Sequence, residues 1–129
     1  MNARIGLALA LLALLFVSCN RSHKAAPVAV AGPSQYELQI GKEVYQTYCL
    51  GCHGETGAGD GFNSFNLDPH PRDLGDPAFQ KKKTTAELAD AVRRGGTGVG
   101  LSSLMPPWGH TLDSRRIDAV VLYVRSLRR

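Results

Sequence analysis

The sequence predicts a small all-α domain with three main helices joined by long loops. Three segments carry apolar residues at the spacing of an amphipathic helix, and each begins at a residue that can cap a helix. No segment shows the strict apolar and polar alternation that is typical of a strand. Two stretches rich in glycine and proline, 54–83 and 95–112, separate the helices. Such long loops are unusual in a compact domain, so we expect them to wrap around a bound group.

The first helix is predicted over Gln35–Tyr48. Ser34 and Glu37 form the pattern of a capping box, in which each residue satisfies a backbone N–H of the other. Apolar side chains then recur at four-residue spacing, at Ile40, Val44 and Tyr48. This spacing places them on one face of the helix.

Two further helices are predicted nearer the carboxyl end. Thr84 and Glu87 form a second capping box, and Gly95 is placed to end that helix. Its apolar face comprises Leu88, Ala91 and Val92. Asp113 can cap the third helix. The apolar stripe of that helix is Ile117, Val120, Val121, Val124 and Leu127, and its charged residues are Arg115, Arg116, Asp118, Arg125 and Arg128.

The chain of 129 residues has room for one small domain, which we expect over 34–129. Residues 1–18 are typical of an export signal, with Arg4 ahead of an apolar run from Ile5 to Val17. That run is 13 residues long, whereas a helix that spans a membrane needs roughly 20 apolar residues. A cleaved signal is therefore favoured over a permanent transmembrane anchor.

Cys19 follows the export signal and is predicted to carry a lipid. Leu15-Phe16-Val17-Ser18-Cys19 resembles the lipobox of bacterial lipoproteins, in which the cysteine becomes the lipidated first residue. Phe16 is bulkier than the residue usual there, but it also disfavours ordinary cleavage after Ser18. Residues 19–33, rich in alanine, proline and valine, then form a linker to the membrane. We expect an exported domain on the periplasmic side.

The chemistry is predicted to reside in Cys49-Leu50-Gly51-Cys52-His53. Thiols three residues apart lie on one side of a helical turn, where both can bond to the vinyl groups of a haem, and the adjacent His53 can bind the iron. A redox-active dithiol is one alternative, but it is usually found in a βαβ setting. A zinc site is another, and it needs further ligands. Two thioethers and a lipid on Cys19 together account for all three cysteines.

Met105 is the predicted second axial ligand of the iron. The only other methionine is Met1, and Met105 begins the loop sequence Met105-Pro106-Pro107-Trp108. Paired prolines limit how far such a loop relaxes, and a methionine thioether is a known haem ligand. His70 and His110 are the rival ligands. A buried methionine in the core is the alternative role for Met105.

From about Tyr36 to Leu127 the chain resembles a class I cytochrome c. The resemblance rests on Gly41 and Tyr45, on Cys49-Leu50-Gly51-Cys52-His53-Gly54, on Met105-Pro106-Pro107-Trp108, and on the closing segment Ile117–Leu127 with Tyr123. It implies the small cytochrome c fold, with long loops wrapped around one covalently bound haem c. It also implies that the first and last helices cross closely, with Gly41 allowing the approach and Tyr45 and Tyr123 packed at the crossing.

The resemblance further implies that a proline carbonyl accepts a hydrogen bond from the second ring nitrogen of His53. Pro69 and Pro71 are the candidates, although the sequence around them differs from the mitochondrial pattern. Arg72 and Trp108 are candidate contacts of the haem propionates. Surface ion pairing for Arg72 and core packing for Trp108 are the alternatives.

With both axial positions of the iron filled, we predict a one-electron carrier and not an enzyme. The alternatives are a haem c subunit of a larger oxidoreductase complex, or a haem enzyme or gas sensor if Met105 does not stay bound. The partners are then a redox protein donor and acceptor. The mild net charge of +4 does not indicate nucleic-acid binding, and Gly95–Gly100 lacks the preceding strand of a nucleotide-binding loop. The run Lys81–Lys83 could steer an acidic redox partner, although a solvated loop is the favoured interpretation. The sequence does not indicate the oligomeric state.

Overall fold

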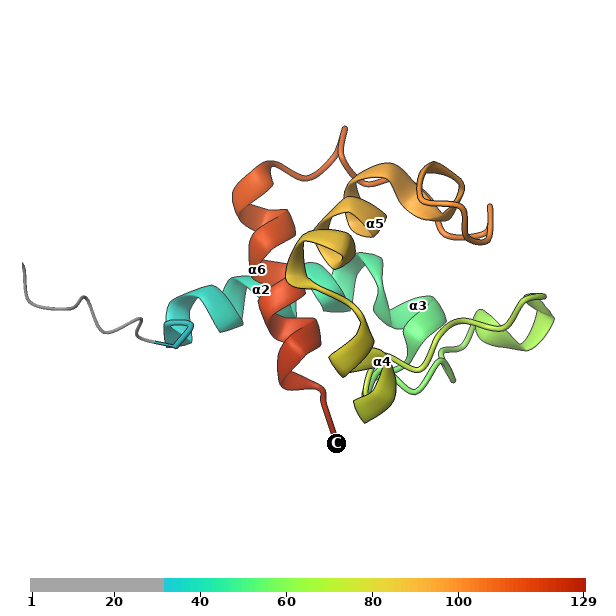
Figure 1. The fold of residues 1–129 in the computed structure, drawn as a ribbon, viewed down its shortest axis with the longest axis horizontal. Helices are drawn as coiled ribbons and strands as arrows, with labels where there is room; N and C mark the ends of the chain where they lie inside the picture. The colour runs from blue at the N-terminus through green and yellow to red at the C-terminus, as the bar shows by residue number, and fades with distance from the viewer. Residues whose placement is uncertain (1–31) are drawn as a thin grey trace, which may run out of the picture. The chain divides into compact units, whose positions relative to one another are not determined.

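The computed structural model describes residues 32–129, which form helices and no strand (Figure 1). The helices are α2 (Gln35–Tyr48), α3 (Leu50–His53), the 3-10 turn η2 (Ser64–Asn66), α4 (Pro77–Lys82), α5 (Thr85–Gly98) and α6 (Ser114–Ser126). The predicted all-α class is confirmed. Cys19, the export signal and nearly all of the linker lie outside the described residues. None of the described helices combines the length and the hydropathy that crossing a membrane requires.

All three predicted helices begin at the predicted caps. The Ser34 side chain accepts from the backbone N–H of Glu37, and the Glu37 carboxylate accepts from the Ser34 N–H at 2.9 Å. Thr84 and Glu87 make the same pair of bonds at the start of α5. Asp113 accepts from the N–H of Arg116 at 2.8 Å. Each cap of this kind stabilises its helix by about 1 kcal/mol, so local sequence defines where the helices start.

The core lies where α2 crosses α6 (Figure 1). A Cβ atom added to Gly41 would lie 2.1 Å from the carbonyl oxygen of Ala119, so only glycine permits this approach of the two backbones. The Tyr45 and Tyr123 rings pack beside it with centroids 5.2 Å apart. The predicted crossing is present. The buried residues of the core, which come from α2, α5, α6 and the loop before α6, are Val44, Tyr45, Leu88, Ala89, Leu112, Ile117, Val120, Val121 and Val124.

Gly41→Ala should destabilise the domain by about 1–3 kcal/mol, because the new methyl group forces α2 away from α6. Urea unfolding of the haem-loaded protein measures the loss. Gly32→Ala is the control, since nothing lies within 4 Å of a Cβ at Gly32. Equal unfolding midpoints for the two variants would contradict the close crossing.

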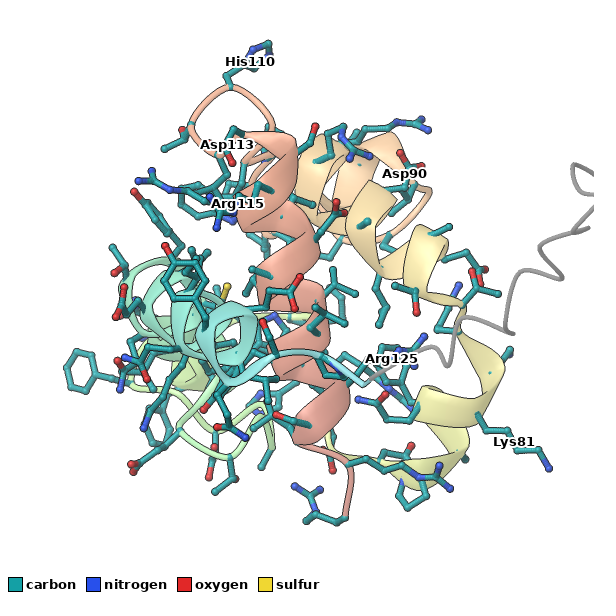
Figure 2. The ribbon with its side chains drawn as sticks, turned by 90° about the vertical axis from the view of Figure 1, so that its left-hand side faces the viewer. Lys81, Asp90, His110, Asp113, Arg115 and Arg125 are labelled. Carbon is teal, nitrogen blue, oxygen red and sulfur yellow. The ribbon has the colours of Figure 1, made fainter. Side chains whose placement is uncertain are left out.

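Helix α4 lies within a stretch that we predicted to be a loop, and that part of the prediction is wrong. Asp76 caps α4 by accepting from the N–H of Ala78, and Pro77 occupies the first turn. Lys81 and Lys82 therefore form the last turn of a helix, where their charge favours the helix dipole, and Lys83 is its C-cap. Figure 2 shows Lys81 pointing into solvent.

The buried polar side chain of Gln80 links α4 to α6 through hydrogen bonds. Gln80 is 6% exposed and donates to the carbonyls of Leu74 and Val124 at 2.6 and 2.9 Å. Arg125, predicted to belong to the charged face of the last helix, turns toward α4 (Figure 2) and donates to the Gln80 side chain at 2.8 Å and to the Lys83 carbonyl. Because these polar groups are paired, their burial is tolerated.

Candidate functional site

One helical turn brings the two thiols and the imidazole of the predicted site together. Cys49 is the C-cap of α2, and the backbone N–H groups of Cys52 and His53 both donate to its carbonyl, at 3.2 and 2.9 Å. Helix α3 then ends at Gly54, whose φ of 76° turns the chain sharply. Cys49 and Cys52 are free thiols and half-buried. The motif therefore has the local geometry that its spacing predicts.

The Cys49 thiol is not suited to dithiol redox chemistry. Burial, and secondarily the nearby Cys52, raise the pKa of Cys49 to about 12. Dithiol oxidoreductases depend on the opposite shift, because the thiolate is the attacking species. The described residues also contain no group of three or more His, Cys, Asp or Glu side chains able to hold a metal ion. They therefore lack the four ligands of a structural zinc site.

The His53 ring is oriented by a backbone carbonyl. Its Nδ1 lies 3.2 Å from the carbonyl oxygen of Arg72. A carbonyl only accepts, so the hydrogen bond requires the proton on Nδ1 and leaves the lone pair on Nε2. Burial lowers the pKa of His53, although the bond to Arg72 works in the opposite direction. The lowered pKa of His53 favours the neutral ring, and the hydrogen bond then places the ring proton on Nδ1. Histidine binds metals in this neutral form.

The predicted acceptor for His53, the carbonyl of Pro69 or Pro71, is wrong. The Pro71 carbonyl oxygen instead lies against Gly59, where an added Cβ would be only 2.3 Å away. The next carbonyl along the chain, that of Arg72, consequently faces the imidazole. The accepting carbonyl thus lies in the predicted segment, one residue after Pro71.

Arg72 and Trp108, the predicted propionate contacts, both have partners within the protein. The Arg72 guanidinium pairs with Asp76 at 2.6 Å and lies 5.1 Å from the centroid of the Phe79 ring. The half-buried Trp108 packs against Tyr48, with ring centroids 5.0 Å apart. Their contacts with haem propionates stay predictions.

Tyr45 has a role at the site that sequence reasoning did not identify. Its hydroxyl donates to the carbonyl of Gly54 at 2.7 Å, directly after His53, and the bond is buried. Burial also raises the pKa of the Tyr45 hydroxyl well above its usual range. A Cβ on Gly54 would collide with the Asp60 carboxylate, and the φ of Gly54 is positive, so both the space and the backbone conformation require glycine here. Tyr45 therefore links the helix crossing to the end of the Cys–His turn.

Tyr45→Phe should lower the free energy of unfolding by about 1–3 kcal/mol, because it leaves the buried Gly54 carbonyl without its donor. Tyr123→Phe is the matched control: it removes a hydroxyl from the ring packed against Tyr45. Tyr123→Phe should change the free energy of unfolding by less than about 0.5 kcal/mol. Guanidinium unfolding curves of both variants provide the comparison, and equal losses would argue against a special role for the Tyr45 hydroxyl.

The loop that carries Met105 follows α5 in the orange part of the chain (Figure 1). Met105 is half-buried, and its carbonyl accepts from the N–H of Gly96 at 2.9 Å. His70 and His110 are both exposed, and Figure 2 shows His110 pointing outward from its loop. Of the three candidate ligands, Met105 is thus the least exposed.

The residues present fit a haem c. Two thiols and a neutral imidazole on one turn are the donor set for covalent attachment and iron ligation. Large apolar side chains are also exposed in both long loops, outside the helical core: Phe62, Phe65, Leu101 and Leu104 are between 46 and 88% exposed. Exposed apolar groups of this size are typical of surfaces that bind an apolar partner or ligand.

Comparison with known proteins agrees with this assignment. Residues 37–124 match the family model described as cytochrome c oxidase, cbb3-type, subunit III. Relatives include the cbb3-type cytochrome c oxidase subunit FixP of Bradyrhizobium diazoefficiens, 29% identical over 71% of this chain. Another is the subunit CcoP of Azospirillum brasilense, 31% identical over 67% of this chain. The chain spans only 28% and 27% of the lengths of these two relatives.

The fold also matches a solved structure, the KustC0563 c-type cytochrome. The TM-score is 0.53 at 22% sequence identity, and the match covers 69% of this chain and 98% of the other. One assignment thus accounts for the three predicted helices, the Cys–His turn and the similarity of fold. The chain belongs to the family of cbb3-type cytochrome c oxidase subunit III, and its domain is a monohaem class I cytochrome c that binds haem c covalently.

Proposed function

We propose that this chain carries single electrons between redox proteins on the periplasmic side of a membrane, to which a lipid on Cys19 tethers it. The observation that carries the proposal is the hydrogen bond from His53 Nδ1 to the Arg72 carbonyl, beside two free thiols. In this arrangement Nε2 of His53 would bind the iron, and Cys49 and Cys52 would bond to the haem. The bound haem supplies a reversible one-electron couple.

His53 and Met105 would both bind the haem iron. The iron would then have no open site for substrate or oxygen, so electron transfer would be favoured over catalysis. Methionine is a soft ligand that stabilises the ferrous state, and a comparatively high reduction potential follows. The chain itself is then a carrier and not an enzyme.

A redox titration followed by absorbance tests this function. The purified protein should show one transition that fits a single electron, and its reduced form should not bind carbon monoxide. Rapid carbon monoxide binding would instead support the haem enzyme or gas sensor.

A second candidate function is that of a haem c subunit within a larger oxidase complex. The match to subunit III of the cbb3-type oxidases over residues 37–124 favours it. Purification of the tagged chain from mild detergent extracts of its native membranes separates the two. Recovery of other oxidase subunits in constant proportion would support the complex, whereas recovery of the monohaem chain alone would support the free carrier.

Cys19→Ala should abolish lipid attachment and leave the export signal uncleaved, because cleavage of such a signal occurs at the lipidated cysteine and Phe16 disfavours ordinary cleavage after Ser18. A single acyl chain binds membranes only marginally, whereas several chains anchor stably. The intact mass of each protein measures both changes. A wild-type mass that lacks lipid, or a Cys19→Ala mass that shows cleavage at the wild-type position, would contradict the proposed anchor.

A further inference from the structure

We infer that backbone hydrogen bonds from the carboxyl end of α5 hold the Met105 loop in place, and we call this set of bonds the clamp. Gly95 is the positioning residue of this clamp. The inference rests on the proposed function, since it requires Met105 to bind the iron. Gly95 interrupts α5 with φ 68° and ψ 177°, and the chain forms one more turn before Gly98. The helix therefore ends its regular hydrogen bonding at the point where the Met105 loop returns.

Three backbone hydrogen bonds join this helix end to the Met105 loop. The Gly96 N–H donates to the Met105 carbonyl at 2.9 Å. The N–H groups of Trp108 and Gly109 donate to the carbonyls of Val92 and Arg93, both at 3.0 Å. In a continuous helix those two carbonyls would accept from residues four positions later. The loop takes the place of the missing turn, so it is held on both sides of Pro106 and Pro107.

Gly95 determines how closely the loop can approach. A Cβ at this position would lie 2.7 Å from the nitrogen of Pro107, 2.8 Å from the carbonyl oxygen of Met105 and 2.9 Å from the carbonyl carbon of Pro106. All three are backbone atoms, which cannot rotate out of the way as the end of a side chain can. Any side chain at Gly95 must therefore push the loop, and Met105 with it, away from α5.

Displacement of the loop should weaken ligation by Met105 without removing the ligand. A metal site tolerates misplacement of its ligands by only about 0.5 Å. The two prolines restrict the backbone that would have to compensate. Gly95 does not itself touch the proposed ligand atom, so it acts through the loop.

Gly95→Ala and Gly100→Ala make a matched pair for the test. Both glycines have positive φ, 68° and 72°, so alanine is strained at either position. Nothing lies within 4 Å of a Cβ at Gly100, whereas the Met105 loop fills the space at Gly95. The readouts are the charge-transfer band of methionine-ligated ferric haem and the imidazole concentration that displaces the methionine.

In Gly95→Ala the band should weaken or disappear, and imidazole should displace Met105 at about tenfold lower concentration, which corresponds to about 1.4 kcal/mol. Gly100→Ala should match the wild type in both readouts. Gly109→Ala is the second variant if Gly95→Ala does not fold. Its Cβ would lie 2.8 Å from the Arg93 carbonyl without a positive φ, so it should shift imidazole displacement in the same direction.

The outcomes separate the clamp from the ligand assignment. A wild-type spectrum without the methionine band contradicts ligation by Met105, and the clamp fails with it. If the wild type has the band and the folded Gly95→Ala and Gly109→Ala variants match it in both readouts, the clamp is overturned while the ligand assignment stands. If Gly95→Ala and Gly100→Ala weakened the methionine band and eased imidazole displacement equally, the cause would be general backbone strain, and the clamp would also be overturned.

Discussion

Replacing both Cys49 and Cys52 by serine should abolish covalent haem attachment and leave a chain that does not fold stably. Serine is similar in size to cysteine but forms no thioether with the haem vinyl groups. The described domain is small, and its long loops expose apolar residues such as Phe62 and Phe65. The free energy of unfolding of a small domain is only about 5–15 kcal/mol, so we expect loss of the haem to remove most of that stability.

Circular dichroism and haem absorbance of the purified variants measure this effect. Each single variant retains one thioether position and should keep some covalent haem, which makes the pair of single variants a control for expression. If the double variant were as helical and as stable as the wild type without bound haem, the haem would not be a structural part of this domain.

Met105→Ala should open one face of the iron while leaving the haem attached. The reduced variant should bind carbon monoxide readily, and its reduction potential should fall by on the order of 100 mV or more, because loss of the thioether destabilises the ferrous state. Leucine is the matched substitution for shape, so Met105→Leu should produce the same spectral change with less disturbance of packing. Redox titration and carbon monoxide difference spectra measure both effects.

Variants His70→Ala and His110→Ala should behave as the wild type in the same assays, since both histidines are exposed. If His110→Ala, and not Met105→Ala, opened the iron to carbon monoxide, the axial ligand would have to be reassigned. Loss of function in Met105→Ala without any spectral change would likewise exclude Met105 as a ligand.

The three long helices were predictable because their signals are local. Ser34, Thr84 and Asp113 each cap a helix through contacts within three residues, and sequence displays such pairs directly. Helix α4 was missed although Asp76 and Pro77 are a recognisable start, because six residues are too few for an apolar period. Its stability comes from Gln80 and Arg125, which meet across 45 residues of chain.

The site was predictable to the extent that it is contiguous. Cys49, Cys52 and His53 share one turn, and their spacing alone indicates their geometry. The acceptor of the His53 hydrogen bond is not local in this sense. The Pro71 carbonyl packs against Gly59, so the Arg72 carbonyl faces the His53 ring. The contact between Gly95 and the Met105 loop likewise depends on a return of the chain that no local pattern specifies.

The most direct test of the account is the intact mass of the protein, made in a host competent for cytochrome maturation and measured under denaturing conditions. The account predicts that the chain carries the added mass of one haem, which is retained after unfolding and absent when Cys49 and Cys52 are both replaced. A wild-type polypeptide with no such addition, colourless once denatured, would contradict it.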